Sequence, residues 1–198
     1  MTKTKTIIFY ILSFTWGIVM SLIGSLVLLV LIIAGKKPQK FHDRIYIEIG
    51  KGWGGVELGP FFLCSENSSY SLMQHESGHG FQNALLGPLM PFLVCIPSAA
   101  RYWLWEFDNF EDKNKYSVTV SVAFLLISMG FLIPGVIVNN VGIIITGSLL
   151  TFYTLCFAAW LIAVETPKYA QRPYPKYDDI WFEGCATRWG AKVYPANN

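Results

Sequence analysis

Residues 118–164 read VTVSVAFLLISMGFLIPGVIVNNVGIIITGSLLTFYTLCFAAWLIAV, and this stretch decides the class of fold. Two apolar runs, Val118 to Val138 and Val141 to Val164, are separated only by Asn139-Asn140, and neither contains a charged residue. Each run can cross the hydrocarbon core of a bilayer, which takes about 20 residues of helix. Asparagines are suited to a tight turn. The sequence therefore predicts a hairpin of two transmembrane helices, over 118–138 and 141–164.

A third apolar run, Ile7 to Ala34, lies between two groups of lysines. It is too long for the apolar part of a signal peptide, and no small-residue cleavage site precedes the lysines that follow it. We therefore predict a retained transmembrane helix over residues 7–34.

The composition agrees with a membrane protein. Hydrophobic residues make up 53% of the 198-residue chain and charged residues only 14%, which is unusual for a soluble domain. The formal net charge of +2 is too small to indicate a nucleic-acid partner. The four cysteines form no CxxC pair, and we interpret them as small apolar residues and not as a disulfide framework. We expect a single membrane-embedded domain over residues 1–198.

The sequence His75-Glu76-Ser77-Gly78-His79 is the part of the chain that predicts chemistry. In a helix, histidines four residues apart lie one above the other on the same face. They can then occupy two corners of a zinc tetrahedron, with the glutamate between them as general base toward an activated water. We predict that His75 and His79 bind Zn²⁺ and that Glu76 is the catalytic residue.

Start and stop signals for a helix surround this motif. Ser71 and Gln74 fit a capping box, with Ser71 as the N-cap, and Gly87-Pro88 is typical of a helix end. We expect a helix over residues 71–86. Two glycines inside it, Gly78 and Gly80, are costly in a helix interior and indicate that another segment approaches closely there.

A catalytic zinc site needs a third protein ligand. The only other histidine, His42, follows a linker rich in lysine and proline, and we interpret it as a solvated or interfacial residue. A better candidate lies in a tail helix expected over residues 178–193, with Asp178-Asp179 as its N-cap signal. Glu183 shares one face of this helix with small residues at i+3, i+4 and i+7. We predict Glu183 as the third zinc ligand, because such a face can lie close to another helix.

Residues 44–63 show the alternation of apolar and polar side chains that favours strands. Glycines lie between the two alternating runs, so we predict a β-hairpin over this range. The open edge of a strand near the motif helix can bind an extended substrate peptide through main-chain hydrogen bonds.

Leu89 to Trp105 is apolar, but it contains two prolines and ends in an aromatic cluster typical of a membrane interface. If it crossed the bilayer, the motif and the tail would lie on opposite sides. Because the predicted site needs both, we favour a re-entrant or interfacial segment over residues 89–105. With three spans, Lys3 and Lys5 then lie on one side and all other lysines and arginines on the other. The positive-inside rule places the motif and the tail in the cytoplasm and the N-terminus outside.

Two resemblances follow from these motifs. HExxH followed by ExxA resembles the membrane gluzincin metallopeptidases of the CAAX prenyl protease and HtpX-like type. The second motif reads Glu183-Gly-Cys-Ala186-Thr187-Arg-Trp-Gly190-Ala191 here, and Thr187 stands where that family has an aspartate that orients a metal-binding histidine. A threonine hydroxyl can accept the same hydrogen bond but brings no charge, so the basicity of the ligand falls.

The HExGH motif, together with Gly87-Pro88-Leu89 and Ile96-Pro97-Ser98, also resembles a group of small uncharacterised bacterial membrane proteins. These resemblances imply a multi-pass protein of the bacterial cytoplasmic (inner) membrane with a zincin-like helix. They also imply a hydrolase, a zinc metalloprotease, that cleaves membrane-associated proteins or peptides. The alternatives are a catalytically silent zinc-binding scaffold or partner subunit, and a membrane protein whose His-Glu pair is incidental. We expect a mainly α integral membrane protein with three transmembrane helices, a re-entrant or interfacial segment and a small β-hairpin.

Overall fold

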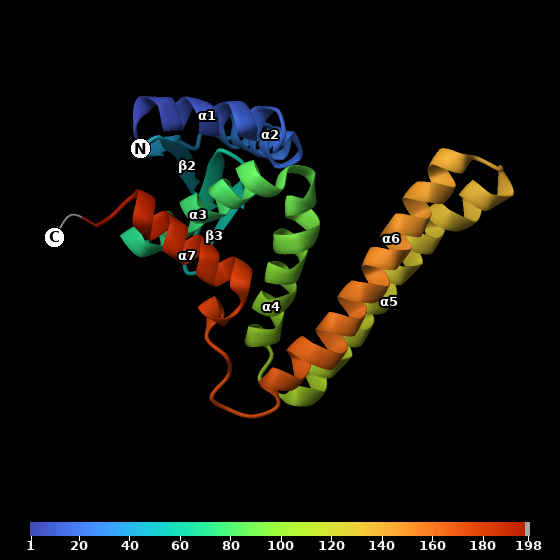
Figure 1. Ribbon diagram of the computed structural model, residues 1–198. Helices are drawn as coiled ribbons and strands as arrows, with labels where there is room; N and C mark the ends of the chain where they lie inside the picture. The colour runs from blue at the N-terminus through green and yellow to red at the C-terminus, as the bar shows by residue number, and fades with distance from the viewer. Residues whose placement is uncertain (197–198) are drawn as a thin grey trace. The chain divides into compact units, whose positions relative to one another are not determined.

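The structure, a computed structural model, describes residues 1–196 and divides into two compact units (Figure 1). Unit 1 comprises residues 1–95 and 176–196, and unit 2 comprises residues 96–175. The chain is mainly helical, as the sequence predicts, and contains one small mixed sheet. All of the predicted site residues belong to unit 1.

Unit 1 begins with two helices, α1 (Lys3–Phe14) and α2 (Ile18–Ile33). The prediction of one continuous helix over 7–34 is therefore wrong, because the two axes are bent by 92° at residues 15–17. The bend follows from close packing. The position that a Cβ of Gly17 would take lies 2.6 Å from Nδ2 of Asn83, and Trp16 donates from Nε1 to the carbonyl oxygen of Leu85, at 3.0 Å.

Four short strands form the sheet: β1 (Gln39–Phe41), β2 (Arg44–Glu48), β3 (Gly55–Leu58) and β4 (Phe61–Cys64). Their order is β1-β2-β4-β3, with β2 and β4 parallel and the other pairs antiparallel. The predicted hairpin over 44–63 is therefore wrong in its pairing. Both predicted runs are strands, but β4 lies between them, so β3 is an edge strand.

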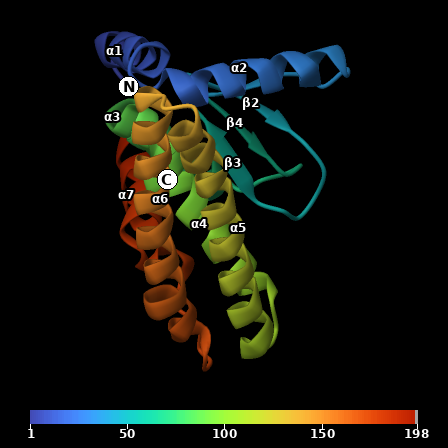
Figure 2. The same cartoon turned by 90° about the vertical axis from the view of Figure 1, so that its right-hand side faces the viewer.

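The two faces of the sheet pack against different helices (Figure 2). Because side chains alternate along a strand, each strand serves both faces. On one face, Met20 and Leu28 of α2 pack with Ile47, Leu58 and Leu63. The other face packs against α3 and the end of α7 through a second cluster, which contains Phe41, Tyr46, Phe62, Cys64 and Tyr194.

Helix α3 (Tyr70–Leu86) contains the motif, and it ends at Gly87, whose φ of +57° only glycine adopts readily. The stop signal is thus confirmed, but the predicted capping box is wrong. Ser69 is the N-cap and accepts from the backbone N–H of Leu72, at 3.2 Å, while Gln74 donates to the carbonyl oxygen of Tyr194. Because the C-cap residue of α7 (Trp181–Val193) provides that carbonyl, the tertiary contact replaces the local cap.

The tail forms a 3₁₀ turn, η5 (Tyr177–Asp179), and then α7 (Trp181–Val193). Asp179 accepts from the backbone N–H of Lys176, at 2.8 Å, so it closes the turn before the helix and is not the N-cap of α7. The expected helix over 178–193 is otherwise present.

Residues 87–106 are helical in three pieces: the 3₁₀ turn η1 (Gly87–Leu89), the π-turn η2 (Pro91–Cys95) and α4 (Ile96–Glu106). The boundary between the two units falls between Cys95 and Ile96, inside the range predicted as a re-entrant or interfacial segment. This stretch reaches the length and hydropathy of a membrane span only when it is joined to α3 across the break at Met90.

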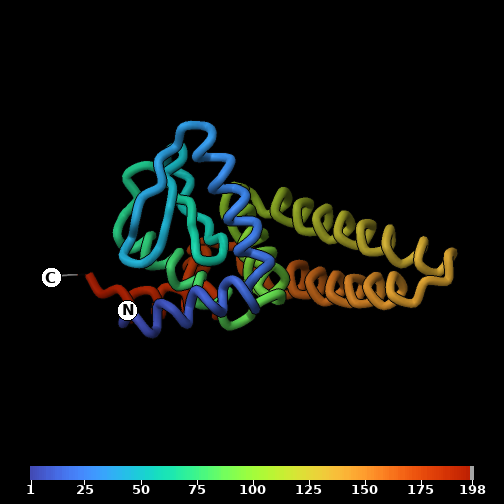
Figure 3. The backbone as a smooth tube through the Cα atoms, turned by 90° about the horizontal axis from the view of Figure 1, so that it is seen from above, coloured from blue at the N-terminus to red at the C-terminus, as the bar shows by residue number. Residues whose placement is uncertain are grey.

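Unit 2 contains the predicted hairpin as α5 (Phe110–Ile137) and α6 (Val141–Ala159), side by side and antiparallel (Figures 1 and 3). A π-turn, η3 (Trp160–Glu165), and a 3₁₀ turn, η4 (Thr166–Tyr169), extend α6. Among the described residues, α5 and α6 with its extension are the two helices that are long and apolar enough to cross a membrane. The turn between them has Asn139 at φ +50° and Asn140 as the N-cap of α6.

A candidate metal centre

Helix α3 places two imidazole rings side by side. His75 and His79 are four residues apart, and their ring centroids are separated by 4.6 Å. Their Nε2 atoms lie 3.0 Å apart. One helical turn thus brings two nitrogen ligands to a single point, as the spacing predicts.

Helix α7 brings a carboxylate to the same point. Oε2 of the fully buried Glu183 lies 3.2 Å from Nε2 of His75 and 3.0 Å from Nε2 of His79. The three ligand atoms all lie within 4.8 Å of one another. The structure therefore brings together the three residues that the sequence predicts as metal ligands.

Small residues allow α3 and α7 to approach this closely. A Cβ added at Gly78 would meet the carbonyl oxygen of Ala186, and one added at Gly190 would meet the carbonyl oxygen of Gln74. The glycine inside the motif and the small face of the tail helix therefore have one shared role, which is to let the two backbones touch. Without this contact, the carboxylate of Glu183 would not reach the two histidines.

The outer ring nitrogens fix the orientation of the histidines. Gln82 donates from Nε2 to the carbonyl oxygen of Phe182, at 2.6 Å, so its Oε1 faces Nδ1 of His79, at 2.7 Å. A carboxamide oxygen only accepts hydrogen bonds, so Nδ1 of His79 carries the proton. In the neutral form of the ring, this leaves the lone pair on Nε2, which faces His75 and Glu183.

His75 has a similar partner, because its Nδ1 lies 2.8 Å from the hydroxyl oxygen of Thr187. A hydrogen bond to the second ring nitrogen is the usual arrangement around a metal-bound histidine. Lone pairs of Nε2 atoms and a carboxylate oxygen that converge on one point repel one another unless a cation lies between them. This donor set, two imidazole nitrogens and one carboxylate oxygen, fits Zn²⁺ with one coordination position left over.

The charges around the site also favour a cation. Burial alone would lower the pKa of His79, but the hydrogen bond and charge of Glu183 and the charge of Glu76 outweigh it and raise that pKa to about 9. Burial raises the pKa of Glu76, while the charges of His79 and His75 act in the opposite direction. The centre therefore attracts positive charge.

Glu76 points toward the edge strand of the sheet. A Cβ at Gly55, the first residue of β3, would lie 2.7 Å from Oε1 of Glu76. Only a residue without a side chain leaves room for the carboxylate here. The buried Glu76 therefore lies against the first residue of β3, the edge strand of the sheet.

A buried arginine explains the second glycine of α3. Arg44, from β2, donates to the carbonyl oxygens of Ser77, at 2.8 Å, and Gly59, at 3.3 Å. Its guanidinium lies against Gly80, where a Cβ would collide with it, and over the ring of Phe9, at 3.7 Å. Arg44 thus connects the sheet, α1 and the motif helix, a role that the sequence did not reveal.

His42 lies apart from the cluster, as the sequence predicts. It occupies the β1–β2 turn with φ +54°, stacks on Tyr194 and lies 2.7 Å from the hydroxyl of Tyr70. Gln82, by contrast, was missed by the sequence prediction. Its signal was its position, because a residue three after His79 lies on the same face of the helix.

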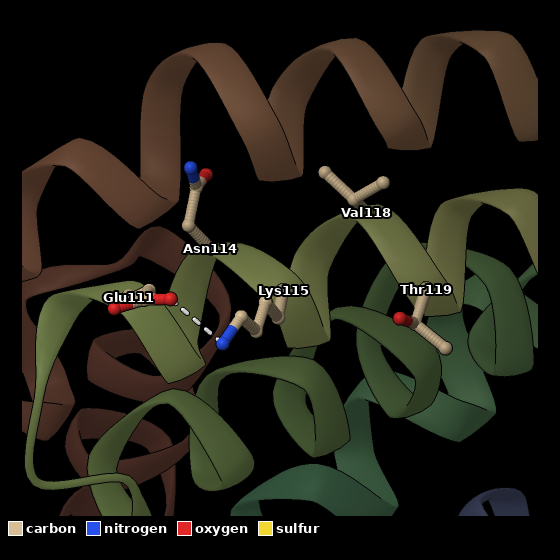
Figure 4. A pocket seen from close by; sticks show the side chains of 5 residues that line it. All are labelled: Glu111, Asn114, Lys115, Val118 and Thr119. Carbon is tan, nitrogen blue, oxygen red and sulfur yellow. Dashed lines mark ion pairs between the residues drawn. The ribbon is translucent and has the colours of Figure 1, made fainter.

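A surface pocket lies in unit 2, along one side of α5 (Figure 4). It contains an exposed ion pair between Lys115 and Glu111, at 2.7 Å. Its lining comprises Glu111, Asn114, Lys115, Val118 and Thr119. None of the candidate metal ligands lines it.

No known protein family, curated protein or solved structure matches the chain.

Proposed function

We propose that this protein is a membrane-integrated zinc metallopeptidase, with a zincin-like α3 helix, that hydrolyses peptide bonds of membrane-associated proteins or peptides. The observation that carries the proposal is the convergence of His75, His79 and Glu183 beside the buried carboxylate of Glu76. The hydrogen bond to Gln82 also supports the proposal. It keeps the proton of His79 on Nδ1, so that the lone pair of Nε2 is left for a metal ion.

In this proposal His75, His79 and Glu183 hold the metal. A zinc ion in this position supplies a Lewis acid that polarises a carbonyl group and lowers the pKa of a water molecule toward 7. Glu76 takes one proton from the attacking water and passes it to the leaving amine as the C–N bond breaks. The water oxygen ends in the new carboxyl group, which passes its remaining proton to the amine, so that the products are a carboxylate and an ammonium group.

The edge strand β3 supports a peptide as the substrate class. Gly55 of β3 lies against Glu76, so a peptide that pairs with this edge passes beside the catalytic carboxylate. Main-chain pairing presents a scissile bond in an extended conformation. The two membrane-spanning helices of unit 2 favour substrates that are held at or near the bilayer.

We place the site on the cytoplasmic side. The turn of the α5–α6 hairpin carries no lysine or arginine, while basic residues lie before and after the hairpin. The positive-inside rule then assigns the regions that hold the cluster to the cytoplasm.

The first test is the zinc content of detergent-purified protein, measured by elemental mass spectrometry. Wild type and Glu76→Gln should hold about one zinc per chain, because Glu76 is not a ligand. Glu183→Ala and the isosteric Glu183→Gln should lose most of it. Glu111→Gln, at an exposed position of α5, is the matched control and should keep its zinc. Wild type without zinc, even after incubation with the metal, would contradict the proposal.

The second test is cleavage of a fluorescently labelled, unfolded membrane protein. Wild type and Glu111→Gln should cleave it, and Glu76→Gln should not, although it keeps its zinc. The neutral hydroxyl of Thr187 beside His75 favours one alternative, a catalytically silent zinc-binding scaffold. Stoichiometric zinc without any cleavage that depends on Glu76 would support that alternative.

A further inference from the structure

The bent pair α1–α2 lies flat along one side of unit 1. Both helices lie at the same margin of this unit in two perpendicular views (Figures 1 and 2), and the view from above shows the corner between them (Figure 3). The angle between their axes is 92°. A helix that crosses a bilayer along its length does not turn by a right angle halfway.

The inner face of α1 is attached to the rest of unit 1 along its length. At its start, Thr6 donates to Oδ2 of Asp43, at 2.8 Å, and Tyr10 donates to the carbonyl oxygen of Asp43, at 2.7 Å. Further along, the ring of Phe9 packs on that of Phe81, with centroids 5.6 Å apart, and on the guanidinium of Arg44.

The contacts with Asp43 carry a topological consequence. Asp43 follows the α1–α2 pair in the chain, in the turn between β1 and β2, and Thr6 lies at the beginning of the pair. Because a hydrogen bond joins them, the chain before α1 and the chain after α2 lie on the same side of any membrane that the pair contacts. A pair that crossed the bilayer would separate these two residues by the thickness of the hydrocarbon core, about 30 Å.

The inner face of α2 packs against the rest of unit 1 as closely as that of α1 does. Gly24 packs against the carbonyl oxygen of Leu58, and Ser21 donates to the carbonyl oxygen of Ser13, at 2.6 Å, across the corner. Met20 and Leu28 enter the core beneath the sheet. Both helices are therefore fixed with one face toward the protein.

The outer faces are apolar and exposed. On α1 the exposed large side chains recur at helical spacing opposite Phe9, and on α2 they recur opposite Gly24. We call these exposed apolar side chains the outer face; its members are Ile7, Ile8, Ile11, Leu12, Val19, Leu22, Leu26, Leu29, Val30 and Ile33. A patch of this kind on a protein with two membrane-spanning helices needs a partner.

We propose that the outer face is immersed in the hydrocarbon of one leaflet, so that α1 and α2 lie in the plane of the membrane and neither crosses it. Exposed lysines flank the patch at both ends: Lys3 and Lys5 in the first turn of α1, and Lys36, Lys37 and Lys40 after α2. Lysines at the border of an apolar face fit the anionic headgroups of a phospholipid leaflet. The occupant is therefore lipid.

This arrangement changes the predicted topology. All 15 lysines and arginines lie outside residues 116–167, the part of the chain that contains the α5–α6 turn. With α1 and α2 in the plane, α5 and α6 are the only spans among the described helices, and every basic residue lies on one side. The N-terminus then lies on the same side as the metal cluster, and not opposite to it as the sequence alone predicts.

Labelling of single added cysteines in right-side-out and inside-out membrane vesicles tests the topology. Thr4→Cys reports on the N-terminus, Lys51→Cys on the β2–β3 loop, and Val141→Cys on the hairpin turn. A membrane-impermeant maleimide should label Thr4→Cys and Lys51→Cys in one vesicle orientation and Val141→Cys in the other, above the background of wild type. Labelling of Thr4→Cys together with Val141→Cys would overturn the proposal.

The depth of α2 in the bilayer tests the in-plane orientation. Spin labels at Val19→Cys and Ile33→Cys, both on the outer face, should show equal ratios of collision with oxygen and with a polar nickel complex. If α2 crossed the bilayer, these positions would differ in depth by about 21 Å, at 1.5 Å per residue, and their ratios would differ strongly. Unequal ratios would overturn the proposal.

The same labels identify the occupant. With lipid against the outer face, a label at Leu26→Cys should be mobile and accessible to oxygen. Dipolar broadening between labels on different chains would overturn the lipid assignment and indicate a second copy of the protein. These readouts do not depend on zinc or on cleavage, so they hold or fail separately from the proposed peptidase activity.

Discussion

Thr187 places a neutral hydroxyl beside Nδ1 of His75, at 2.8 Å, where a carboxylate would make the imidazole a stronger ligand. We expect Thr187→Val to weaken zinc binding by about 10-fold to 100-fold, the range typical for loss of such a partner. Thr187→Ser keeps the hydroxyl and should bind as wild type, and Thr187→Asp should bind more tightly. Competition with a chromophoric chelator measures all three, and equal affinity of the valine and serine variants would contradict this role.

Glu57 makes the stability of the folded protein depend on pH. It is buried on β3, and burial raises its pKa from 4.5 to about 8, although the charges of His79 and Arg44 oppose this. The folded protein therefore keeps a proton that the unfolded chain releases above pH 4.5. This group thus contributes stability that is complete below about pH 4.5 and is lost as the pH rises to about 8.

The variant Glu57→Gln removes this dependence. Because each pKa unit corresponds to about 1.4 kcal/mol, we expect the variant to melt at a higher temperature than wild type at pH 8 and at a similar temperature at pH 5. Thermal melts in detergent at both values check this. Glu66→Gln, at a half-exposed position, is the control and should show no such difference between the two pH values.

At the residue level, the candidate site residues were easier to predict from the sequence than the residues that hold them in place. His75, Glu76 and His79 follow from a spacing that is local to one helix, and Glu183 follows from a helical face of small residues. The hydrogen-bond partners of the histidine ring nitrogens depend on the position of α7, which no local sequence pattern predicts. Arg44 is the extreme case, because a buried guanidinium between three elements looks in sequence like any charged residue on an alternating strand.

The cluster depends on the packing of helix α3 against helix α7, and Gly78 is one of the glycines at which the two backbones touch. Gly78→Ala drives a Cβ into the carbonyl oxygen of Ala186. Overpacking of this kind costs about 1–3 kcal/mol, more than the roughly 1 kcal/mol that alanine gains over glycine in a helix. We expect a lower melting temperature and a lower zinc content.

Gly130→Ala is the matched control, because Gly130 lies inside α5 with no atom within 4 Å of its added Cβ. It should leave the zinc content unchanged and should not lower the melting temperature. If Gly78→Ala behaved like Gly130→Ala, the close contact of the two helices would not be required.

The helices that a single sequence pattern determines were predicted well. The hairpin of α5 and α6 follows from two long apolar runs, and α3 ends at the predicted glycine. The break between α1 and α2 was missed because an apolar run gives no sign of where lipid ends and protein contact begins. The pairing of the strands was missed because alternation identifies a strand but not its neighbour, and β4 lies between the two runs.

For the whole molecule, the proposed zinc ion would join segments that lie more than 100 positions apart in the sequence. A ligand that binds only the folded protein adds stability, about 2.7 kcal/mol at 100 times its dissociation constant. We expect a chelator to lower the melting temperature of wild type, and added zinc to restore it. Glu183→Gln should melt at the same temperature with and without chelator, and a shift in that variant would mean that the metal binds elsewhere.

The order of the segments along the chain has a consequence for biosynthesis. The two histidines are made first, the α5–α6 hairpin follows, and the carboxylate of Glu183 is made only after it. The whole hairpin is therefore synthesised before the donor set can close. A nascent chain interrupted anywhere before residue 183 carries the paired imidazoles without their carboxylate. In the proposed metal centre, the donor set is therefore complete only after both apolar helices of unit 2 have been made.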